Sequence, residues 1–494
     1  MSNEASTRIR KGRLGRPAAV VAGIAVVGSV FVASAAIASA VWSQATPLSF
    51  AAGVHGATAD DQMVSVSCAS VGACTATGLF KNAAGGASGL TVSSTGGVWG
   101  QATPIVFAPG VEDSSSFQFT NPVSVSCASV GNCTVVGQFH DANSRFDAFT
   151  VSSVNGVWAQ AVPVTFAAGV RDTIPDLGLV SVKCVSAGNC SAVGSFRNPT
   201  GDREAFTVSS VNGVWGQGVP VTFAAGVQHA SPRTGLYSVS CASAGNCTGA
   251  GTFKNATGGF DAFTVSSVGG TWAQAVPVTF VAGVQNASPD ATLYSVSCGS
   301  AGNCTAVGRF KNAAGGYEAF TVTSVNGVWG QGAPVTFASG AQSSVHGDAV
   351  ASVSCVTSGN CSIVGQFKNP SGGLVPFVAS SSSGVWGQAS QVGFASGVQS
   401  STTNDAALSV SCASAGNCGA VGRFTNAAGN FEGFTLTQTD DSTVNNPASA
   451  GPTTVAPALP ATGRDSAEML MVAVFAMVAG LMMMARRNRD DLRC

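Results

Sequence analysis

The chain has 494 residues, of which only 9% are charged, with 22 Lys and Arg balanced by 23 Asp and Glu. An ordinary soluble domain has roughly 25% charged residues, so this composition excludes a charge-rich disordered chain and a polybasic nucleic-acid binder. Apolar runs near membrane length occur only at the two ends, which argues against a polytopic membrane protein. The composition favours an exported Gly-, Ser- and Ala-rich β protein, with no cofactor expected.

The N-terminus has the three parts of a secretory signal peptide. Five basic residues within 1–16 precede an apolar run over 17–37, and Ala38-Ser39-Ala40 follows. A basic segment, a hydrophobic core and an A-x-A site are what a signal peptidase reads. The sequence predicts a signal peptide over residues 1–40 with cleavage after Ala40. The alternative is an uncleaved membrane anchor.

The C-terminus carries a second localisation signal. The pentapeptide Leu459-Pro460-Ala461-Thr462-Gly463 precedes an apolar stretch over 467–485 and a basic tail with Arg486, Arg487, Arg489 and Arg493. This order resembles the LPXTG cell-wall sorting signal of Gram-positive surface proteins. The apolar segment and its cytoplasmic arginines would hold the precursor in the plasma membrane. The resemblance implies that a sortase cuts after Thr462 and joins it to peptidoglycan, so sortase and peptidoglycan are expected partners and the cell wall the expected location. The alternative is a plain C-terminal membrane anchor.

The middle of the chain repeats itself seven times. Fourteen cysteines form Cys-x5-Cys pairs that lie 59 residues apart at first and 57 residues apart thereafter. The pairs are Cys68/Cys74, Cys127/Cys133, Cys184/Cys190, Cys241/Cys247, Cys298/Cys304, Cys355/Cys361 and Cys412/Cys418. A fixed period of this length indicates one structural unit per repeat.

Each unit has the pattern of four short strands. In the fifth repeat they are expected near 293–298, 304–310, 318–324 and 328–337, each rich in Val, Phe or Thr and bounded by Gly, Asn or Pro. No stretch outside the termini has a convincing helical period. Seven such units predict an all-β protein, a seven-bladed β-propeller of four-stranded antiparallel blades. Apolar or small residues on both strand faces fit blades that are covered on both sides.

The repeats are out of phase with a simple tandem array. A Trp-containing strand, Val41–Phe50, precedes the first cysteine pair, and the seventh pair has no Trp after it. The sequence therefore predicts that 41–50 completes the seventh blade and closes the ring, which removes the exposed sheet edges. An open solenoid or a row of disulfide-stapled units is the alternative. The predicted organisation is a signal peptide (1–40), propeller (41–437), polar Pro-rich linker (438–458) and sorting signal (459–494).

The hairpins at Ser152–Trp158, Ser209–Trp215 and Thr323–Trp329 have the form Ser/Thr-Ser-Val-Asn-Gly-Val-Trp. They resemble the Asp-box, or bacterial neuraminidase repeat, but have Asn in place of Asp and a shorter Gly-to-Trp spacing. In that family the box is a structural turn of a propeller. The resemblance supports the fold and names a sialidase-like glycoside hydrolase as the enzyme alternative.

The paired cysteines are expected to form disulfides. A five-residue hairpin places each pair opposite one another, and disulfides fit an exported protein. Zinc binding is the rival interpretation, but no His accompanies the pairs at a regular spacing, so no metal site is predicted.

Charged residues gather at one edge of the predicted blades. The loops that enter each blade carry Asp60, Asp61, Glu112, Asp113, Arg171, Asp172, Asp176, Arg233, Asp290, Asp348 and Asp405. The loops between second and third strands carry, among others, Lys81, Asp141, Arg145, Arg203, Glu204, Lys254, Lys311, Glu318 and Lys368, and His55, His140, His229 and His346 lie at the same edge. Loops on a rigid scaffold are where binding residues collect, and the acidic excess predicts an electronegative channel mouth. The candidate ligand face is Asp60, Asp61, Asp172, Asp176, Arg203, Glu204, His229, Arg233, Asp290 and Asp348.

These observations favour a binding or adhesion module for a glycan or protein ligand, with no catalytic residues assigned and no nucleic-acid partner. A sialidase-like enzyme would need an arginine triad, a Tyr nucleophile and an acid. Tyr237 and Tyr294 occupy equivalent positions in successive repeats, which is typical of packing. A structural coat or spacer is the third hypothesis, and it predicts no difference between the two faces.

Overall fold

The computed structural model describes residues 47–56, 61–112, 118–173, 176–400 and 403–438, and these contain strands and turns without a helix. Within these ranges, no helix has the length and apolar character needed to span a bilayer. The predicted signal peptide, linker beyond Gln438 and sorting signal lie outside the described residues. Gln438 itself, assigned to the linker from the sequence, is the last residue of a strand.

The strands form seven successive sheets, here called blades 1 to 7. Blade 1 contains β1 (Gln62–Ser70), β2 (Ala73–Lys81), β3 (Ala87–Thr95), β4 (Val98–Trp99) and β5 (Thr103–Pro104); blade 2 contains β6 (Thr120–Ser129), β7 (Asn132–His140), β8 (Phe146–Val154), β9 (Val157–Trp158) and β10 (Val162–Pro163). Blade 3 contains β11 (Gly178–Ser186), β12 (Asn189–Arg197), β13 (Arg203–Val211), β14 (Val214–Trp215) and β15 (Val219–Pro220); blade 4 contains β16 (Thr234–Ser243), β17 (Asn246–Lys254), β18 (Phe260–Val268), β19 (Thr271–Trp272) and β20 (Val276–Pro277). Blade 5 contains β21 (Ala291–Ser300), β22 (Asn303–Lys311), β23 (Tyr317–Val325), β24 (Val328–Trp329) and β25 (Ala333–Pro334); blade 6 contains β26 (Ala349–Thr357), β27 (Asn360–Lys368), β28 (Leu374–Ser382), β29 (Val385–Trp386) and β30 (Ser390–Gln391). Blade 7 contains β31 (Ala406–Ser414), β32 (Asn417–Thr425) and β33 (Phe431–Gln438).

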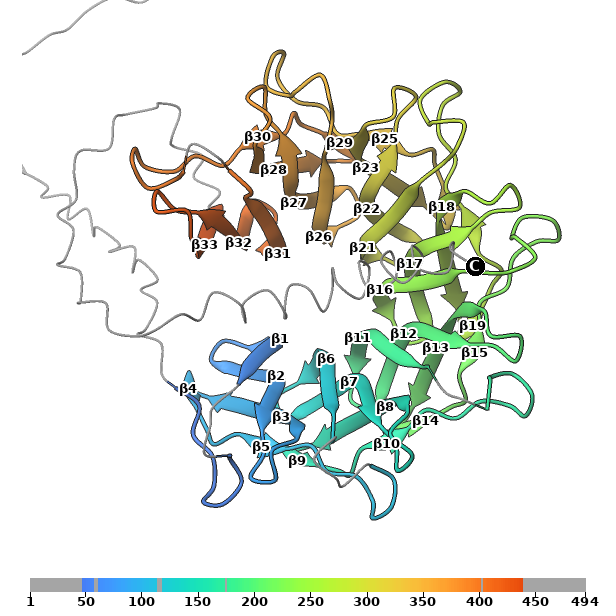
Figure 1. Cartoon of the computed structure of the whole chain (residues 1–494), viewed down its shortest axis with the longest axis vertical. Coiled ribbons are helices and arrows are strands. Elements are labelled where there is room, and N and C mark those ends of the chain that lie inside the picture. Colours follow the sequence, from blue (N-terminus) through green and yellow to red (C-terminus); the bar gives the residue numbers. More distant parts are fainter. Residues whose placement is uncertain (1–46, 57–60, 113–117, 174–175, 401–402, 439–494) are drawn as a thin grey trace, which may run out of the picture. The chain divides into compact units, whose positions relative to one another are not determined.

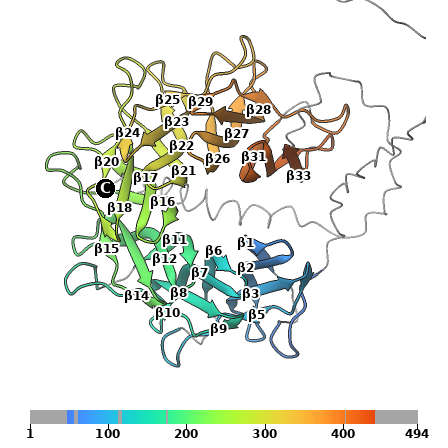
Figure 2. The ribbon, with the colours of Figure 1, turned by 180° about the vertical axis from the view of Figure 1, so that it is seen from behind.

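Each blade is an antiparallel meander whose first strand is innermost (Figure 1). The first strands of successive blades are neighbours, and the view from behind shows the same order (Figure 2). The all-β class and the seven-bladed propeller predicted from the sequence are confirmed.

The predicted fourth strand is wrong in one respect, because it is broken into two short pieces. In blade 5, β24 pairs with the end of β23 (Ser324↔Trp329) and β25 pairs with its start (Phe320↔Pro334). Between them, Gly332 N donates a hydrogen bond of 2.8 Å to Thr279 O, which belongs to the segment leaving blade 4. The outer strand therefore changes partners midway and links neighbouring blades.

Each blade buries a face against the preceding one. Phe280, which leaves blade 4, packs between Phe310 and Phe320 of blade 5 at ring-centroid distances of 4.5 and 5.1 Å. Hydroxyl groups add specific bonds: Val353 N and Cys355 N of blade 6 donate to Ser295 Oγ and Ser297 Oγ of blade 5, at 3.3 and 2.9 Å. Burial of both sheet faces explains the apolar and small residues on both sides of the strands.

The seven predicted disulfides are all present. They join Cys68–Cys74, Cys127–Cys133, Cys184–Cys190, Cys241–Cys247, Cys298–Cys304, Cys355–Cys361 and Cys412–Cys418. Each pair lies directly across the first hairpin of its blade, as Cys298 does opposite Cys304. Sulfurs joined in this way are not available as zinc ligands.

The two edges of a blade are arranged as the sequence predicts. At one edge the two hairpin turns meet: Gly327 N donates to Gly302 O at 2.8 Å. Asn326 and Gly327 have φ values of 51° and 84°, which Asn and Gly tolerate in a two-residue turn. At the other edge, the loop entering blade 5 pairs with the loop between β22 and β23 through a Gln285↔Asn312 bridge.

Closure by residues 41–50 is only partly within the described chain. Phe50 forms a parallel bridge with Ala102 and Leu48 packs on the core of blade 1, just as Phe107 of the next repeat bridges to Ala161. The predicted strand is therefore too long at its end, since residues 48–50 cross onto blade 1. Residues 41–46 lie outside the description, and their pairing with β33 stays a prediction. Val66 on β1 is 59% exposed, while its counterparts in blades 2 to 7 are 5–8% exposed.

Candidate functional site

Two positions that recur in every repeat determine the side-chain contacts at the blade edge where the entering loops lie. The first is a residue near the start of each loop entering a blade, here called the loop residue: His55, Glu112, Arg171, Gln228, Gln285, Gln342 and Gln399. The second lies at the start of the third strand, here called the edge residue: Ser88, Asp147, Glu204, Asp261, Glu318, Val375 and Glu432. Between blades 2 and 3 and between blades 4 and 5, the loop residue contacts the edge residue of the preceding blade.

In several blades the loop residue bonds within its own loop. Gln342 Nε2 donates to Asp348 Oδ2 at 2.7 Å, and Gln228 Nε2 donates to Thr234 Oγ1 at 2.6 Å. Gln399 bonds to Asp405 in the same way. In each case the acceptor lies at or just before the start of the innermost strand, so the bond fastens the loop to the blade that it enters.

In blades 3 and 5 the acceptor position holds Leu177 and Ala291, which offer no side-chain oxygen. The loop residue then turns back to the preceding blade. Arg171 Nη1 lies 3.1 Å from both carboxylate oxygens of Asp147, and Gln285 Nε2 donates to Asp261 Oδ1 at 3.2 Å. At these junctions the loop residue covers the edge carboxylate.

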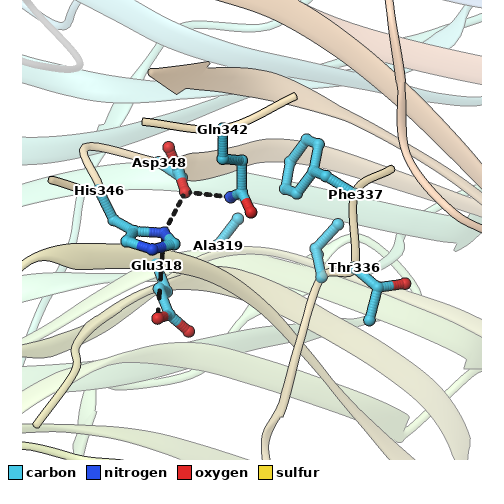
Figure 3. A pocket seen from close by; sticks show the side chains of 8 residues that line it. Glu318, Ala319, Thr336, Phe337, Gln342, His346 and Asp348 are labelled. Carbon is cyan, nitrogen blue, oxygen red and sulfur yellow. Dashed lines mark hydrogen bonds and ion pairs between the residues drawn. The ribbon is translucent and has the colours of Figure 1, made fainter. Parts of the chain in front are cut away.

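The junction between blades 5 and 6 has both an acidic acceptor and an acidic edge residue. Its loop residue, Gln342, is engaged by Asp348, so the edge residue Glu318 is left uncovered. A cavity of about 320 Å³ opens at this position. Its lining is Glu318, Ala319, Val335, Thr336, Phe337, Gln342, His346 and Asp348. Figure 3 shows the Gln342 amide turned toward Asp348, with Glu318 on the other side of His346.

Asp348 is the structural anchor of this site. Its side chain is 1% exposed. Oδ1 accepts hydrogen bonds from Lys368 N and Gly347 N at 2.8 and 3.3 Å, and Oδ2 accepts the Gln342 bond and lies 3.2 Å from His346 Nδ1. Burial raises the pKa of Asp348 above its usual 3.8, although the bonds from Lys368 N, His346 and Gly347 N oppose the shift. Both oxygens are thus occupied within the protein.

Glu318 and His346 are the groups that face the cavity. Their side chains are 22% and 26% exposed, and His346 Nδ1 lies 4.0 Å from Glu318 Oε1. Asn312 Nδ2 holds Oε1 at 2.7 Å. Phe337, Val335 and Ala319 form the apolar part of the wall. The site therefore offers one ordered carboxylate, an imidazole and an amide beside an apolar surface.

The predicted ligand face separates into local groups instead of forming one cluster. Asp61 pairs with His55 at 2.9 Å, Asp176 lies 3.6 Å from Arg197 and 3.9 Å from Arg203, Glu204 accepts from Asn198, Asp172 accepts from Thr173 and Asp290 accepts from Tyr317. His229 accepts a backbone bond from Ser231, Arg233 lies beside Arg203 in a parallel bridge, and Asp60 is outside the described residues. Asp348 and Asp405 are buried and accept hydrogen bonds from Gln342 and Gln399, so these two acids fasten loops.

Sequence reasoning placed Glu318 and His346 at the correct edge but did not select them as ligand residues. The signal that finds them is a comparison of repeats. Among the six junctions between consecutive blades, only that between blades 5 and 6 has acids at both the edge position and the loop acceptor position. Periodicity alone does not reveal the site, because the consequence depends on which of two acids Gln342 contacts.

The three tyrosines of the chain are buried or bonded within the protein. Tyr294 lies at a bulge of β21 and is hydrogen-bonded to Arg309, whose guanidinium lies 4.4 Å from the centre of the Tyr317 ring. Burial raises the pKa of Tyr237 to about 12 and also raises that of Tyr294; burial and the bond to Asp290 raise the pKa of Tyr317 to about 12. In each case burial disfavours the phenolate, as expected for a packed side chain. In the part of the chain that the structure describes, no three His, Cys, Asp or Glu side chains gather as a metal site.

The pairing of the strands and the seven disulfides place the molecule in the class of disulfide-stapled β-propellers. No family model and no curated protein matches the chain. Solved structures of similar fold include a lectin from Burkholderia pseudomallei (14% identity, TM-score 0.39, covering 76% of this chain and 98% of that one) and a Hadza microbial sialidase (12%, 0.37, 67% and 66%). A polysaccharide lyase, an ulvan lyase, is similar at 10% identity and a TM-score of 0.42 over 80% and 93% of the two chains. At these values the likenesses do not assign a ligand or an activity.

Proposed function

We propose that this chain is a surface-displayed binding module, and that the cavity between blades 5 and 6 holds a carbohydrate residue. The observation that carries the proposal is the uncovered Glu318 carboxylate beside His346 and an apolar wall. Sugar hydroxyls donate to carboxylates, while the C–H face of a sugar ring packs on apolar side chains such as Phe337 and Val335. A cavity of about 320 Å³ is at the small end of ligand pockets, which span roughly 300–1,000 Å³, and suits one sugar residue.

The same geometry favours binding over hydrolysis. Glycoside hydrolysis employs two carboxyl groups that both reach the scissile bond. Here Glu318 faces the cavity, but Asp348 is buried and its oxygens are engaged by Lys368 N, Gly347 N and Gln342. A buried carboxylate held in this way serves as an anchor for the loop.

Display on the cell wall belongs to the same proposal and rests on the sequence of the two ends. A signal peptide over 1–40 and the Leu459–Gly463 motif would export the chain and attach it to peptidoglycan. The Asp-box resemblance of the hairpins is compatible with a propeller and implies no activity for these turns. Mass spectrometry of wall digests should find Thr462 joined to a wall peptide, and Thr462→Ala should release the protein or leave it in the membrane.

Glycan binding is tested with the purified protein on neutral and charged oligosaccharide arrays and by calorimetry. We expect binding without turnover of glycosidase substrates, and loss of binding in Glu318→Ala. Asp261→Ala is the matched control, because Asp261 is the equivalent edge residue of blade 4 and is covered by the Gln285 amide. Equal binding by both variants, or no binding to any glycan, would contradict the proposal.

A further inference from the structure

We infer that the cavity between blades 5 and 6 recognises a cationic N–H group, a guanidinium or an ammonium, on its ligand. This inference rests on the proposed function in taking the cavity as the ligand site, and it adds the chemical class of the group bound there. The carrier of that group is either an amino sugar or an arginine side chain, and the experiment below separates the two.

Another junction of the same chain contains such a carboxylate with a guanidinium already bound to it. Between blades 2 and 3, the Arg171 guanidinium lies 3.1 Å from both oxygens of the edge carboxylate Asp147. Between blades 5 and 6, the equivalent positions are Gln342 and Glu318. Gln342 is turned to Asp348, so the volume that the arginine side chain fills in one junction is open in the other.

The walls of the two junctions correspond residue by residue. Ala148, Val164, Thr165 and Phe166 stand in the first junction where Ala319, Val335, Thr336 and Phe337 line the cavity in the second. The wall residues of the two junctions are identical, and both junctions have an edge carboxylate. The cavity therefore has the same surroundings as the place where this chain already binds the Arg171 guanidinium. A charged donor on a carboxylate makes a stronger hydrogen bond than a neutral hydroxyl.

The charges around the cavity also favour a cationic group on the ligand. Glu318 and Asp348 are two acids, and His346 is the basic side chain among the lining residues, 4.0 Å from one and 3.2 Å from the other. Glu318 accepts a neutral amide donor from Asn312, and no Lys or Arg forms an ion pair with it among the described residues. A cation from the ligand would supply the charge that Arg171 supplies to Asp147. Protonation of His346 would oppose that cation.

The test compares probes that differ only in charge, using the intact protein. Nα-acetylarginine amide is compared with its neutral isostere Nα-acetylcitrulline amide, and glucosamine is compared with glucose, which has a hydroxyl in place of the ammonium group, by calorimetry and NMR titration. We expect the cationic member of at least one pair to bind at least tenfold more tightly, with affinity that falls as salt is raised. The pair that shows the difference identifies the carrier.

Three variants assign the effect to the cavity. Glu318→Gln keeps an oxygen acceptor but removes the charge, so it should abolish the preference for the cation while retaining any binding of neutral sugar. Gln342→Arg should fill the cavity from within, as Arg171 does, and block both probes. Asp261→Asn changes an edge carboxylate that Gln285 already covers, so it should alter neither binding nor the preference for the cation. Circular dichroism and unfolding temperature establish that each variant is folded.

The outcomes separate this inference from the proposed function. If neutral and cationic probes bind equally, or if Glu318→Gln preserves a cation preference, the inference is wrong while glycan binding stands. If arginine amide binds in a Glu318-dependent way and no sugar does, the cation site stands and the carbohydrate proposal is wrong. If Gln342→Arg is folded and binds both probes normally, the cavity is not their site.

Discussion

The Sγ of Cys133 in blade 2 lies 3.3 Å from the Oγ1 of Thr75 in blade 1. The same contact recurs further round the propeller, for example between Cys247 and Ser191 at 3.3 Å. Each of these disulfides therefore does two things: it closes its own hairpin and it packs against a hydroxyl of the preceding blade.

This double role predicts unequal effects when cysteine pairs are removed. A short disulfide loop is expected to contribute about 2 kcal/mol, and replacing Cys127 and Cys133 together by Ala should lower the free energy of unfolding by more than that. The Cys68/Cys74 pair in blade 1 has no preceding hydroxyl among its described contacts, so its removal should cost less. Chemical denaturation of the two double variants makes the comparison. Equal losses would show that the interblade contact of Cys133 adds no stability.

The serine hydroxyls between first strands should be individually important. Ser126 Oγ accepts the bond of Cys184 N at 3.0 Å in a buried position. Ser126→Ala leaves that N–H without its acceptor, so we expect a loss of roughly 1–3 kcal/mol in the free energy of unfolding, measured by chemical denaturation. The control is Ser414→Ala at the exposed end of β31, which should change stability by less than about 0.5 kcal/mol. Similar losses in the two variants would show that burial of the Ser126 bond is unimportant.

Arg171 should be replaceable by a free guanidinium compound. Arg171→Ala leaves the buried Asp147 without its ion-pair partner, and burial already raises the pKa of that carboxyl. We expect a lower unfolding temperature and a loss of about 2 kcal/mol, since a desolvated group is left unpaired. Millimolar ethylguanidine should restore part of the loss in Arg171→Ala and leave the wild type unchanged. Failure of rescue in a folded variant would show that the vacated volume collapses.

Buried aspartates give stability a definite dependence on pH. Burial raises the pKa values of Asp147, Asp261 and Asp348 above 3.8 in the folded state, so folding favours their protonated forms. Their favourable contribution is complete below 3.8 and is lost as pH rises through the raised folded-state values. The unfolding temperature should therefore increase as pH is lowered from 7 toward that window. In Asp348→Asn the increase should be smaller; an unchanged profile would exclude Asp348 as a contributor.

The N-terminal residues of the exported form should stabilise blade 7. Residues 41–47 match 98–104 at six of seven positions, and the latter include β4 and β5, the outer strands of blade 1. Blade 7 has β31, β32 and β33 within the described chain, with no outer pair. We expect residues 41–438 to unfold at a higher temperature than residues 47–438, and a synthetic 41–50 peptide to restore part of the difference. Identical unfolding temperatures would contradict closure by this strand.

Local sequence signals predicted most of the fold. Cysteine spacing predicted the first hairpin and its register, and Asn326-Gly327 predicted the second turn, because both depend on neighbouring residues. The split of the outer strand was not predictable in this way, since Gly332 N bonds to Thr279 of another blade. The cavity was even less predictable from the sequence than the split strand. It exists because Gln342 contacts Asp348 and not Glu318, a choice between two acids that only the folded junction decides.

The interchange between Arg171 and Gln342 has a consequence for how such a molecule diversifies. The strand pairs within each blade and the serine hydroxyl bonds between blades do not involve the loop residue. An exchange at this position would therefore open or fill one recess and remove or add one side-chain contact, such as that of Arg171 with Asp147. The recesses around the ring would then change one at a time, each with a limited effect on stability, while the strands of the seven blades stay the same.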